Sequence, residues 1–314
     1  MRFSLIIPVA PHRNAEVLQS VNELNFAKKD YEIIIEKGRN ASENRNRGFE
    51  KSRGEIIVLL DDDGVVPENL LEKADEFLKK HSEIDIVGGP QLTPLDDKGF
   101  AKISGYALSS KFGGWNTSNR YEKKKLNLNA DDTYLTSAIM FCRREVMEKI
   151  KFDVNLWPGE DPKFVTEAKK EGFKVAYNPD LIIYHRRRPT LKALIKQIFN
   201  YGRVGPLREK FSETIKRPFF LIPSLFVIYL TLTLIILDLK LFGLNLIPIK
   251  ILLSPLVLYG VLDLFFSSYE SIKNKDLRGI FLLPFIFPII HISYGIGWVY
   301  SYLKKISEKY LSKI

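Results

Sequence analysis

Two long runs that contain no Asp, Glu, Lys or Arg, at residues 219–237 and 280–303, limit most strongly what this chain can fold into. A helix needs about 20 predominantly apolar residues to cross a bilayer, and both runs have about that length. One such run is compatible with a buried helix of a soluble protein, whereas two predict a membrane domain. A third stretch, residues 249–266, contains two charged residues and a proline, so we expect two to three spans.

The charged residues beside these runs give an incomplete picture of the topology. Lys216 and Arg217 precede the first run, and the positive-inside tendency therefore places the preceding part of the chain in the cytoplasm. If all three stretches cross the membrane, the lysine-rich C-terminal tail would lie outside, against the same tendency. The number of spans and the side of the C-terminus stay open at this point.

The formal net charge of +10 would attract phosphates, anionic lipid or nucleic acid. The predicted membrane domain accounts for much of this charge and the sequence has no nucleic-acid motif, so we expect no nucleic-acid partner. Cys142 is the only cysteine. An internal disulfide is therefore impossible, and a reducing compartment is expected.

The residues before the membrane domain alternate between strand and helix patterns. We expect strands at residues 3–9, 31–36, 56–60 and 85–89, with helices at residues 15–27, 44–52 and 68–80 between them. Such alternation is typical of βαβ units and predicts an α/β domain with a mainly parallel sheet. The spacing is that of a nucleotide-binding fold, although neither a GxGxxG nor a P-loop glycine pattern is present.

Three adjacent carboxylates follow the strand at residues 56–60, where a parallel sheet binds its ligands. Asp61, Asp62 and Asp63 would repel one another, and a magnesium or manganese ion that also contacts a phosphate is the usual compensation. In an extended segment Asp61 and Asp63 point to the same side, so we expect these two to share the ion. The alternative is a polar turn that caps the next helix.

Two further polar segments are candidates for the same site. Glu160 and Asp161 lie between a glycine and a proline, which indicates a loop or a helix start. A carboxylate there could accept a proton from an attacking hydroxyl, or the pair could simply cap the helix. His185 is followed by three arginines, whose guanidinium groups suit either bidentate phosphate contacts or anionic lipid head groups.

The order of these motifs resembles the family 2 glycosyltransferases, which have the GT-A fold. The resemblance is carried by an IIPV first strand, an acid at the end of the second strand, RNRG, the acid triplet and PGEDPKF. SAIMFCRREVMEKIKFD resembles the acceptor-side segment of the family, and GFKVAYNPDLIIYHRRRP the strand and basic segment after the ED motif. LIKQIFNYGR and HISYGIGWVY resemble the membrane-anchored exopolysaccharide glycosyltransferases of the succinoglycan type.

This resemblance implies a role for each candidate residue in a metal-dependent, inverting transfer of a sugar from a UDP- or GDP-sugar. Asp161 would be the catalytic base. The other residues group by what they would bind: the donor (Pro8, Glu36, Arg45, Asp61, Asp62 and Asp63), the acceptor (Glu160 and Trp157), the diphosphate (Arg186, Arg188 and Arg203) and the metal (Asp61, Asp63 and His185). For Glu36, an ordinary solvated strand end is the alternative, and for Glu160 a role in holding its loop.

We therefore expect a cytoplasmic GT-A catalytic domain at residues 1–189, interfacial amphipathic helices at 190–217 and a transmembrane domain at 218–314. The protein would be a multi-pass protein of the cell membrane that contacts membrane lipid and uses a lipid-linked or polysaccharide acceptor. Gln197, Asn200 and Tyr201 stand where processive relatives carry QxxRW. Because Asn and Tyr replace the Arg and Trp of that signature, we expect a single addition.

Two other classes of protein fit part of the sequence. Asp61, Asp63 and Gly64 match the DxDG motif of haloacid-dehalogenase-type phosphatases, but two strands precede the motif here, and in that family it normally follows the first strand. A non-catalytic membrane scaffold is the other alternative, and the acids at every expected position argue against it.

Overall fold

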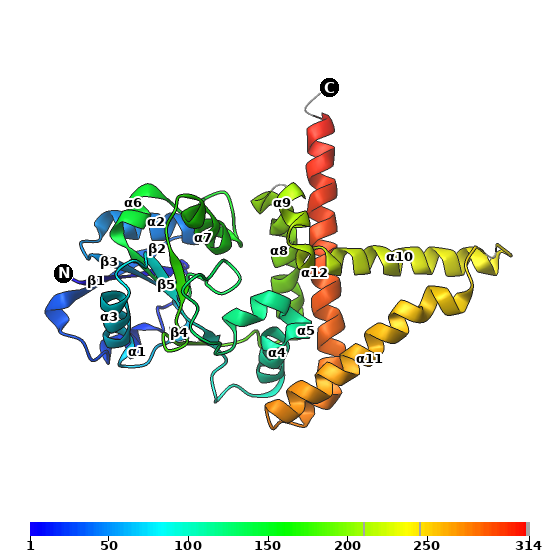
Figure 1. The fold of residues 1–314 in the computed structure, drawn as a ribbon, viewed down its shortest axis with the longest axis horizontal. Helices are drawn as coiled ribbons and strands as arrows, with labels where there is room; N and C mark the ends of the chain where they lie inside the picture. Colours follow the sequence, from blue (N-terminus) through cyan, green and yellow to red (C-terminus); the bar gives the residue numbers. More distant parts are fainter. Residues whose placement is uncertain (210, 245, 312–314) are drawn as a thin grey trace. The chain divides into compact units, whose positions relative to one another are not determined.

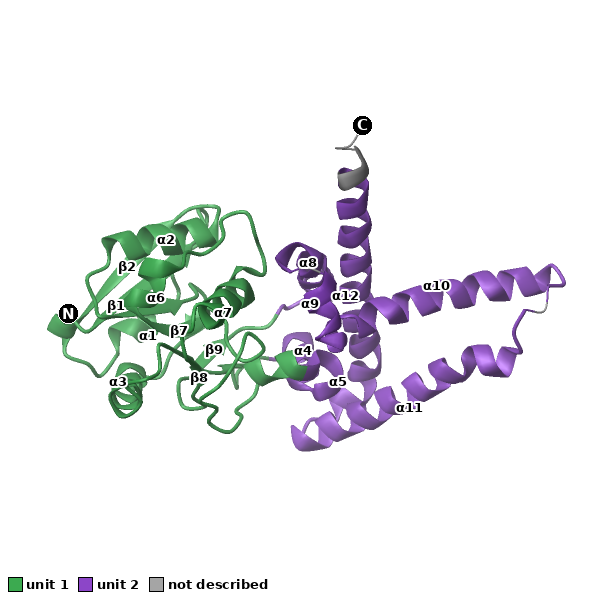
Figure 2. Cartoon of the chain, turned by 45° about the horizontal axis from the view of Figure 1, so that its top comes forward, with its two compact units in different colours: residues 1–97, 116–187 green, residues 98–115, 188–314 purple. Residues whose placement is uncertain are grey.

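The computed structural model describes residues 1–209, 211–244 and 246–311. The chain forms two compact units (Figure 2): Met1–Asp97 with Asn116–Arg187, and Lys98–Trp115 with the chain from Arg188 onward. Residues 98–115 therefore pack with the helical unit, although they lie inside the predicted catalytic domain in sequence. The predicted segments 190–217 and 218–314 include residues 210, 245 and 312–314, which lie outside the described part, and the predicted domain limits stay predictions.

The first unit is built on a six-stranded sheet (Figure 1). Its strand order is β2 (Tyr31–Lys37), β1 (Phe3–Val9), β3 (Ile56–Leu60), β7 (Ile139–Arg143), β5 (Ile86–Gly88) and β8 (Val175–Tyr177). Strand β7 runs antiparallel to both neighbours, and the other pairings are parallel. The predicted α/β domain with a mainly parallel sheet is confirmed.

The central strands are buried on both faces, which explains their unbroken apolar runs. Ile57 and Leu59 of β3 belong to one apolar cluster, while Ile56, Val58 and Leu60 belong to the other. The helices of this unit are α1 (Leu18–Asn22), α2 (Ala41–Lys51), α3 (Leu70–Lys80), α6 (Arg144–Lys149) and α7 (Glu160–Lys170), with a 3₁₀ turn at Lys28–Asp30. A second 3₁₀ turn, Trp115–Arg120, begins at the last residue of the 98–115 segment and continues into this unit.

The helix expected at residues 15–27 is wrong in length. Only Leu18–Asn22 is helical, because the backbone N–H of Asn25 donates to the carbonyl of Glu68 instead of continuing the helix. The helix expected at residues 44–52 begins earlier, at Ala41, where the side chain of Asn40 accepts a hydrogen bond from the Glu43 N–H and caps the first turn.

A second, three-stranded sheet joins segments that are far apart in sequence. Its order is β4 (Gly64–Val65), β9 (Ile183–His185) and β6 (Gln91–Leu92). Gly64 pairs directly with His185, and a Cβ atom at Gly64 would lie 2.2 Å from Cδ1 of Ile183. The absence of a side chain at Gly64 thus lets β9 approach the end of the acid triplet.

The second unit is helical. It contains α4 (Gly99–Ser109), α5 (Lys111–Gly114), α8 (Leu191–Arg208), α9 (Phe211–Ile215), a 3₁₀ turn (Pro218–Phe220), α10 (Ile222–Leu241), α11 (Ile249–Lys273) and α12 (Arg278–Leu311). Three of these helices, α10, α11 and α12, are long and apolar enough to cross a membrane. The third apolar stretch, residues 249–266, thus lies in one continuous helix, α11, despite Pro255.

Helices α8 and α12 lie side by side, as both views show (Figures 1 and 2). Glycines allow this close approach, because a Cβ atom at Gly202 would lie 2.0 Å from the carbonyl oxygen of Tyr294 and one at Gly297 would lie 2.1 Å from that of Phe199. Part of the predicted amphipathic face of α8, including Ile198, is buried, whereas Ile195 stays exposed.

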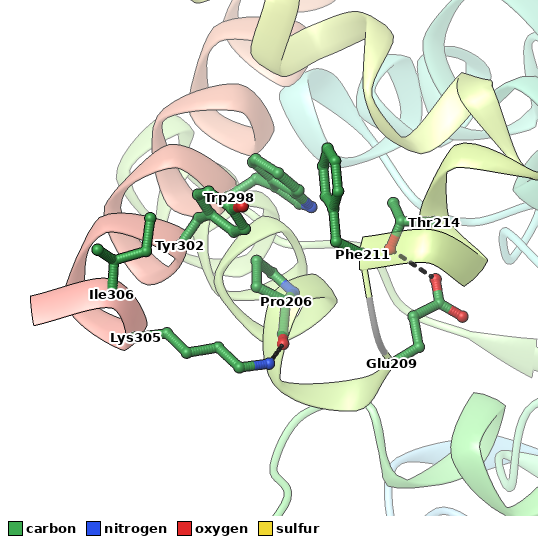
Figure 3. Close-up of a pocket in the computed structure, with 8 residues that line it drawn as sticks. All are labelled: Pro206, Glu209, Phe211, Thr214, Trp298, Tyr302, Lys305 and Ile306. Carbon is green, nitrogen blue, oxygen red and sulfur yellow. Dashed lines mark hydrogen bonds between the residues drawn. The ribbon is translucent and has the colours of Figure 1, made fainter. Parts of the chain in front are cut away.

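A pocket of about 250 Å³ lies in this helical unit (Figure 3). The described residues that line it come from the end of α8, from α9 with the residues before it, and from the second half of α12: Pro206, Glu209, Phe211, Thr214, Trp298, Tyr302, Lys305 and Ile306. This lining contains none of the predicted site residues.

Candidate functional site

The acid triplet begins where β3 ends, at the carboxyl edge of the large sheet. Asp61, Asp63 and His185 each offer one ligand atom, and these atoms lie within 4.8 Å of one another. Asp62 points elsewhere, and its side chain forms an ion pair with Arg13. The expected same-side placement of Asp61 and Asp63 is therefore what the structure has.

The small sheet brings His185 to the two carboxylates. Its Nε2 atom lies 3.0 Å from Oδ1 of Asp63 and 3.8 Å from Oδ2 of Asp61. The other ring nitrogen, Nδ1, is 3.0 Å from the carbonyl oxygen of Arg186. With both ring nitrogens protonated, Nε2 donates to Asp63, and loss of the Nε2 proton would free its lone pair for a metal ion. Burial alone would lower the pKa of His185, but the hydrogen bond and the negative charge of Asp63 raise it.

The three adjacent acids differ in their electrostatics. Burial raises the pKa of Asp61 despite the nearby positive charge of Arg45, and burial likewise raises the pKa of Asp62 to about 6. For Asp63 the effect of burial is outweighed by hydrogen bonds from His185 and Arg13, and its pKa falls well below the usual range. Asp63 is thus the most strongly anionic member of the triplet.

The donor set suits a divalent cation. Two carboxylate oxygens and one imidazole nitrogen lie within 4.8 Å of one another, and carboxylates are the protein ligands that magnesium and manganese prefer. Three protein ligands leave coordination positions open for oxygen atoms of a substrate, as catalytic metal sites require. The side chains therefore fit the metal that the sequence predicts at this position.

Arg45 of α2 connects the acid triplet with the second acid pair. Its Nη1 donates to Oε1 of Glu160 at 2.9 Å and its Nη2 to Oδ1 of Asp61 at 3.3 Å, while Oδ1 of Asp161 is 3.7 Å from Nη1. Burial would lower the pKa of Arg45, but the surrounding carboxylates raise it well above its usual value. One guanidinium thus fixes the spacing of two acidic sites that are distant in sequence.

The acid pair forms the first turn of α7. Glu160 is buried, and burial together with the negative charge of Asp161 raises its pKa to about 7 even though Arg45 opposes the shift. The hydroxyl of Ser137 donates to Oδ1 of Asp161 at 2.6 Å. Glu160 is thus turned onto Arg45, and its expected roles, toward the acceptor or in holding the loop, stay predictions.

Two further residues that are predicted to bind the donor, Pro8 and Glu36, lie on neighbouring strands, and Glu36 forms ion pairs within the protein. Pro8 of β1 lies opposite Glu36 of β2 in the strand register. Glu36 is only 6% exposed and pairs with Arg47 and Lys51, so the alternative of a solvated strand end is wrong. On the predicted acceptor side, Trp157 is 60% exposed in the loop before α7.

The three arginines after His185 do not form one cationic patch. Arg186 pairs with Asp96 and Asp97, with both distances at 2.8 Å, whereas Arg187 is buried and donates to the hydroxyl of Thr93. Arg188 is exposed and, like the predicted diphosphate ligand Arg203, belongs to the second unit.

Two residues that contact the site were not predicted from the sequence. Ser137 orients Asp161, and Arg13 binds the outer side of Asp62 and Asp63. A partial signal existed for Arg13, which is a basic residue in the loop after the first strand and so at the carboxyl edge of the sheet. Ser137 gave no signal beyond its place at the start of a segment that resembles the family.

The family model for "Glycosyltransferase like family 2" matches residues 2–200, which is more than half of the chain. The chain belongs to this family. The α/β unit of this glycosyltransferase therefore has the GT-A fold, and the alternatives of a haloacid-dehalogenase-type phosphatase and of a non-catalytic scaffold are wrong.

One curated relative of this family 2 glycosyltransferase is a transferase of Methanococcus voltae, dolichyl N-acetyl-alpha-D-glucosaminyl phosphate 3-beta-D-2,3-diacetamido-2,3-dideoxy-beta-D-glucuronosyltransferase. The two chains are 24% identical over 161 residues, which are 50% of this chain and 48% of the relative. The match thus spans about half the length of the relative.

Two solved structures also resemble this chain, and each aligns with 66% of this chain at 15% sequence identity. TarS residues 1–349 of S. aureus with UDP-GlcNAc aligns over 66% of that chain with a TM-score of 0.47. The mannosyltransferase PcManGT from Pyrobaculum calidifontis with GDP-Man and Mn²⁺ aligns over 64% of that chain with a TM-score of 0.48.

Proposed function

We propose that this family 2 glycosyltransferase is a metal-dependent, inverting enzyme of the cell membrane. It transfers a sugar from a nucleotide sugar to a lipid-linked or polysaccharide acceptor at the cytoplasmic face. The observation that carries the proposal is the connection of two acidic sites through one buried cation: Arg45 contacts Asp61, which belongs to the metal-binding group, and also Glu160 and Asp161 at the start of α7.

On the donor side, Asp61, Asp63 and His185 hold a magnesium or manganese ion. Such an ion neutralises a diphosphate and acts as a Lewis acid toward a departing nucleoside diphosphate. Pro8, Glu36, Arg45 and Asp62 contact the donor, and Arg186 contacts its diphosphate. The charged members of this set, Glu36, Arg45, Asp62 and Arg186, would have to share or release their protein partners when the donor binds. Arg188 and Arg203 belong to the second unit, and their diphosphate role stays a prediction from the family resemblance.

On the acceptor side, Asp161 accepts the proton of the attacking hydroxyl while the new glycosidic bond forms and the bond to the diphosphate breaks. A single displacement of this kind inverts the anomeric carbon. The hydrogen bond from Ser137 occupies Oδ1 of Asp161, which leaves Oδ2 as the basic atom. Trp157 offers an exposed ring for stacking on a sugar.

The helical unit supports a membrane location and a lipid-linked acceptor. Three of its described helices are long and apolar enough to span a bilayer, and Lys216 and Arg217 at the start of the first favour a cytoplasmic catalytic unit. The name of the Methanococcus voltae relative describes a dolichyl phosphate-linked sugar as its acceptor. These observations favour a lipid-linked acceptor over a polysaccharide. Asn200 and Tyr201, which stand in place of the Arg and Trp of QxxRW, support one sugar addition per acceptor.

A binding panel on the detergent-solubilised full chain tests this function. UDP, GDP and CMP are titrated with and without manganese, and Asp63→Ala is compared with Asp153→Ala, whose carboxylate pairs with Lys163 away from the triplet. We expect tight, metal-dependent binding of one nucleoside diphosphate that is lost in Asp63→Ala and kept in Asp153→Ala. A folded wild-type protein that binds none of the nucleotides would refute the donor site.

A further inference from the structure

Arg13 lies in the turn that follows β1, and its backbone N–H donates to the carbonyl of Ala10 at 3.0 Å. Its guanidinium contacts two of the three acids at once. Nη1 lies 3.2 Å from Oδ1 of Asp62, and Nη2 donates to Oδ2 of Asp63 at 2.8 Å. The two nitrogens of the guanidinium thus bridge the carboxylates of two neighbouring residues.

The two oxygens of Asp63 face different partners. Oδ1 lies 3.0 Å from Nε2 of His185, within the group that fits a metal ion, whereas Oδ2 is bound to Arg13. Arg13 therefore contacts only one of the two carboxylate oxygens of Asp63 and leaves the other to the side of His185. A side chain that holds the outer oxygen of a ligating carboxylate fixes the orientation of that carboxylate and supports metal affinity.

Resting on the metal-dependent function proposed above, we propose that Arg13 is a positioning residue for the metal site. Arg13 holds Asp63 so that Oδ1 faces His185, and Asp62 anchors Arg13. The side chain of Asp62 is 8% exposed and points to Arg13, so an anchoring role accounts for a buried acid that does not belong to the metal-binding group.

An opposite effect of Arg13 has to be weighed, because its positive charge also repels a cation. The side chain of Arg13 is 46% exposed, and water screens the field of a half-exposed charge. Its hydrogen bond to the partly buried Asp63, in contrast, acts on the geometry of a ligand directly. We therefore expect the loss of orientation to outweigh the relief of repulsion when Arg13 is replaced.

The test is a calorimetric titration of the full chain in detergent with manganese chloride alone, without nucleotide. Arg13→Gln removes the positive charge and the pair of guanidinium nitrogens that contact both carboxylates. Arg2→Gln is the matched control. Arg2 also bridges two carboxylates, Glu55 and Asp75, but at the opposite end of β1. We expect the manganese affinity of Arg13→Gln to fall about 10-fold, with Arg2→Gln like the wild type.

Equal or tighter manganese binding by Arg13→Gln would overturn the inference, since a tighter complex would make Arg13 a competitor of the ion. Failure of the function itself gives a different pattern. If the wild type binds manganese but no nucleoside diphosphate, the donor site is refuted while the comparison of Arg13 with Arg2 still decides the inference. If the wild type does not bind manganese, the metal-dependent function and the inference both fail.

A double-mutant cycle tests the anchoring role of Asp62. Asp62→Asn should weaken manganese binding in the wild type, by less than Arg13→Gln does, because the remaining amide still accepts a hydrogen bond. In the Arg13→Gln background the same change should have no further effect. An equal loss in both backgrounds would mean that Asp62 acts without Arg13, which would overturn this part of the proposal.

Discussion

Strand β3 and helix α10 are both apolar runs, but their side chains lie in different surroundings. Every residue of β3 (Ile56–Leu60) is at most 1% exposed. In α10 (Ile222–Leu241), only 11% of the most apolar window is buried inside the protein, and Leu234 is 67% exposed. The first unit thus makes its own apolar core, whereas the second presents an apolar outer surface that suits lipid.

The two units also differ in how their buried polar side chains are arranged. In the first unit, five carboxylates from the acid triplet and from the start of α7 are gathered around Arg45, Arg13 and His185. In the second unit, the buried Asp263 of α11 accepts a hydrogen bond from Ser267 one turn later in the same helix. The comparison indicates that chemistry belongs to the first unit and anchoring to the second.

The largest expected effect concerns catalysis. Asp161→Asn should lower the transfer rate about 10²- to 10⁴-fold, because the amide cannot accept the proton of the acceptor. Asp263→Asn is the matched change in the second unit, and it should leave the rate close to that of the wild type because the amide oxygen still accepts from Ser267. Transfer of radiolabelled sugar to a membrane extract measures both rates. Similar losses of transfer rate in the two variants would contradict the assignment of chemistry to the first unit and anchoring to the second.

The next effect concerns stability. Leu59→Ala in β3 should lower the free energy of unfolding by about 2–5 kcal/mol, because it leaves a cavity in a fully buried site. Leu234→Ala in α10 should cost less than about 1 kcal/mol, since lipid or detergent fills the space. Thermal unfolding in detergent, followed by intrinsic fluorescence, compares the two variants. A larger loss for Leu234→Ala would show that α10 packs against protein.

An arginine substitution should have the opposite pattern, with the larger cost in the second unit and almost none at an exposed leucine of the first. Leu234→Arg places a cation near the middle of an apolar helix, where insertion into the membrane costs about 2.5–3.5 kcal/mol. Leu95→Arg, at a leucine of the first unit that is 88% exposed, should be neutral because water surrounds it. The fraction of each variant found in the membrane pellet after expression gives the measurement. Equal fractions would mean that the exposed face of α10 does not meet lipid.

The sequence predicted the elements in which burial is uniform. Residues 3–9 and 56–60 were predicted with the limits that the structure has, because a strand covered on both faces is apolar throughout its length. Asp61 and Asp63 were predicted to share a site from the period of an extended chain. They do belong to one group, although Asp62 and Asp63 lie in a turn after β3. His185 followed only from the family resemblance, since a strand pairing over more than a hundred residues brings it to Asp63.

The errors arise where distant contacts override local pattern. The helix expected at residues 15–27 stops at Asn22 because Asn25 bonds to Glu68. Arg13 and Ser137 were missed because the direction of a side chain in a loop is set by its partner. The packing of residues 98–115 with the helical unit has no local signal, since an apolar helix face does not specify what it packs against.

The smallest expected effect concerns how residues 98–115 are held in the helical unit. Both ring nitrogens of His291 in α12 form hydrogen bonds, at 2.8 Å to the hydroxyl of Tyr259 in α11 and at 2.8 Å to the carbonyl oxygen of Phe112 in α5. Polar contacts between membrane helices contribute about 0.6 kcal/mol each on average. His291→Leu should therefore destabilise the protein by about 1 kcal/mol.

Tyr259→Phe separates the two contacts, because it removes one hydrogen bond and leaves the other in place. For a chain of 314 residues, 1 kcal/mol corresponds to a change in Tm of about 1–2 °C, so Tyr259→Phe should lower Tm by about half as much as His291→Leu. Limited proteolysis provides a second readout, since loss of the Phe112 contact should expose residues 98–115 in His291→Leu but not in Tyr259→Phe. Equal protection of that segment in both variants would mean that apolar packing alone holds it, as in the core of the first unit.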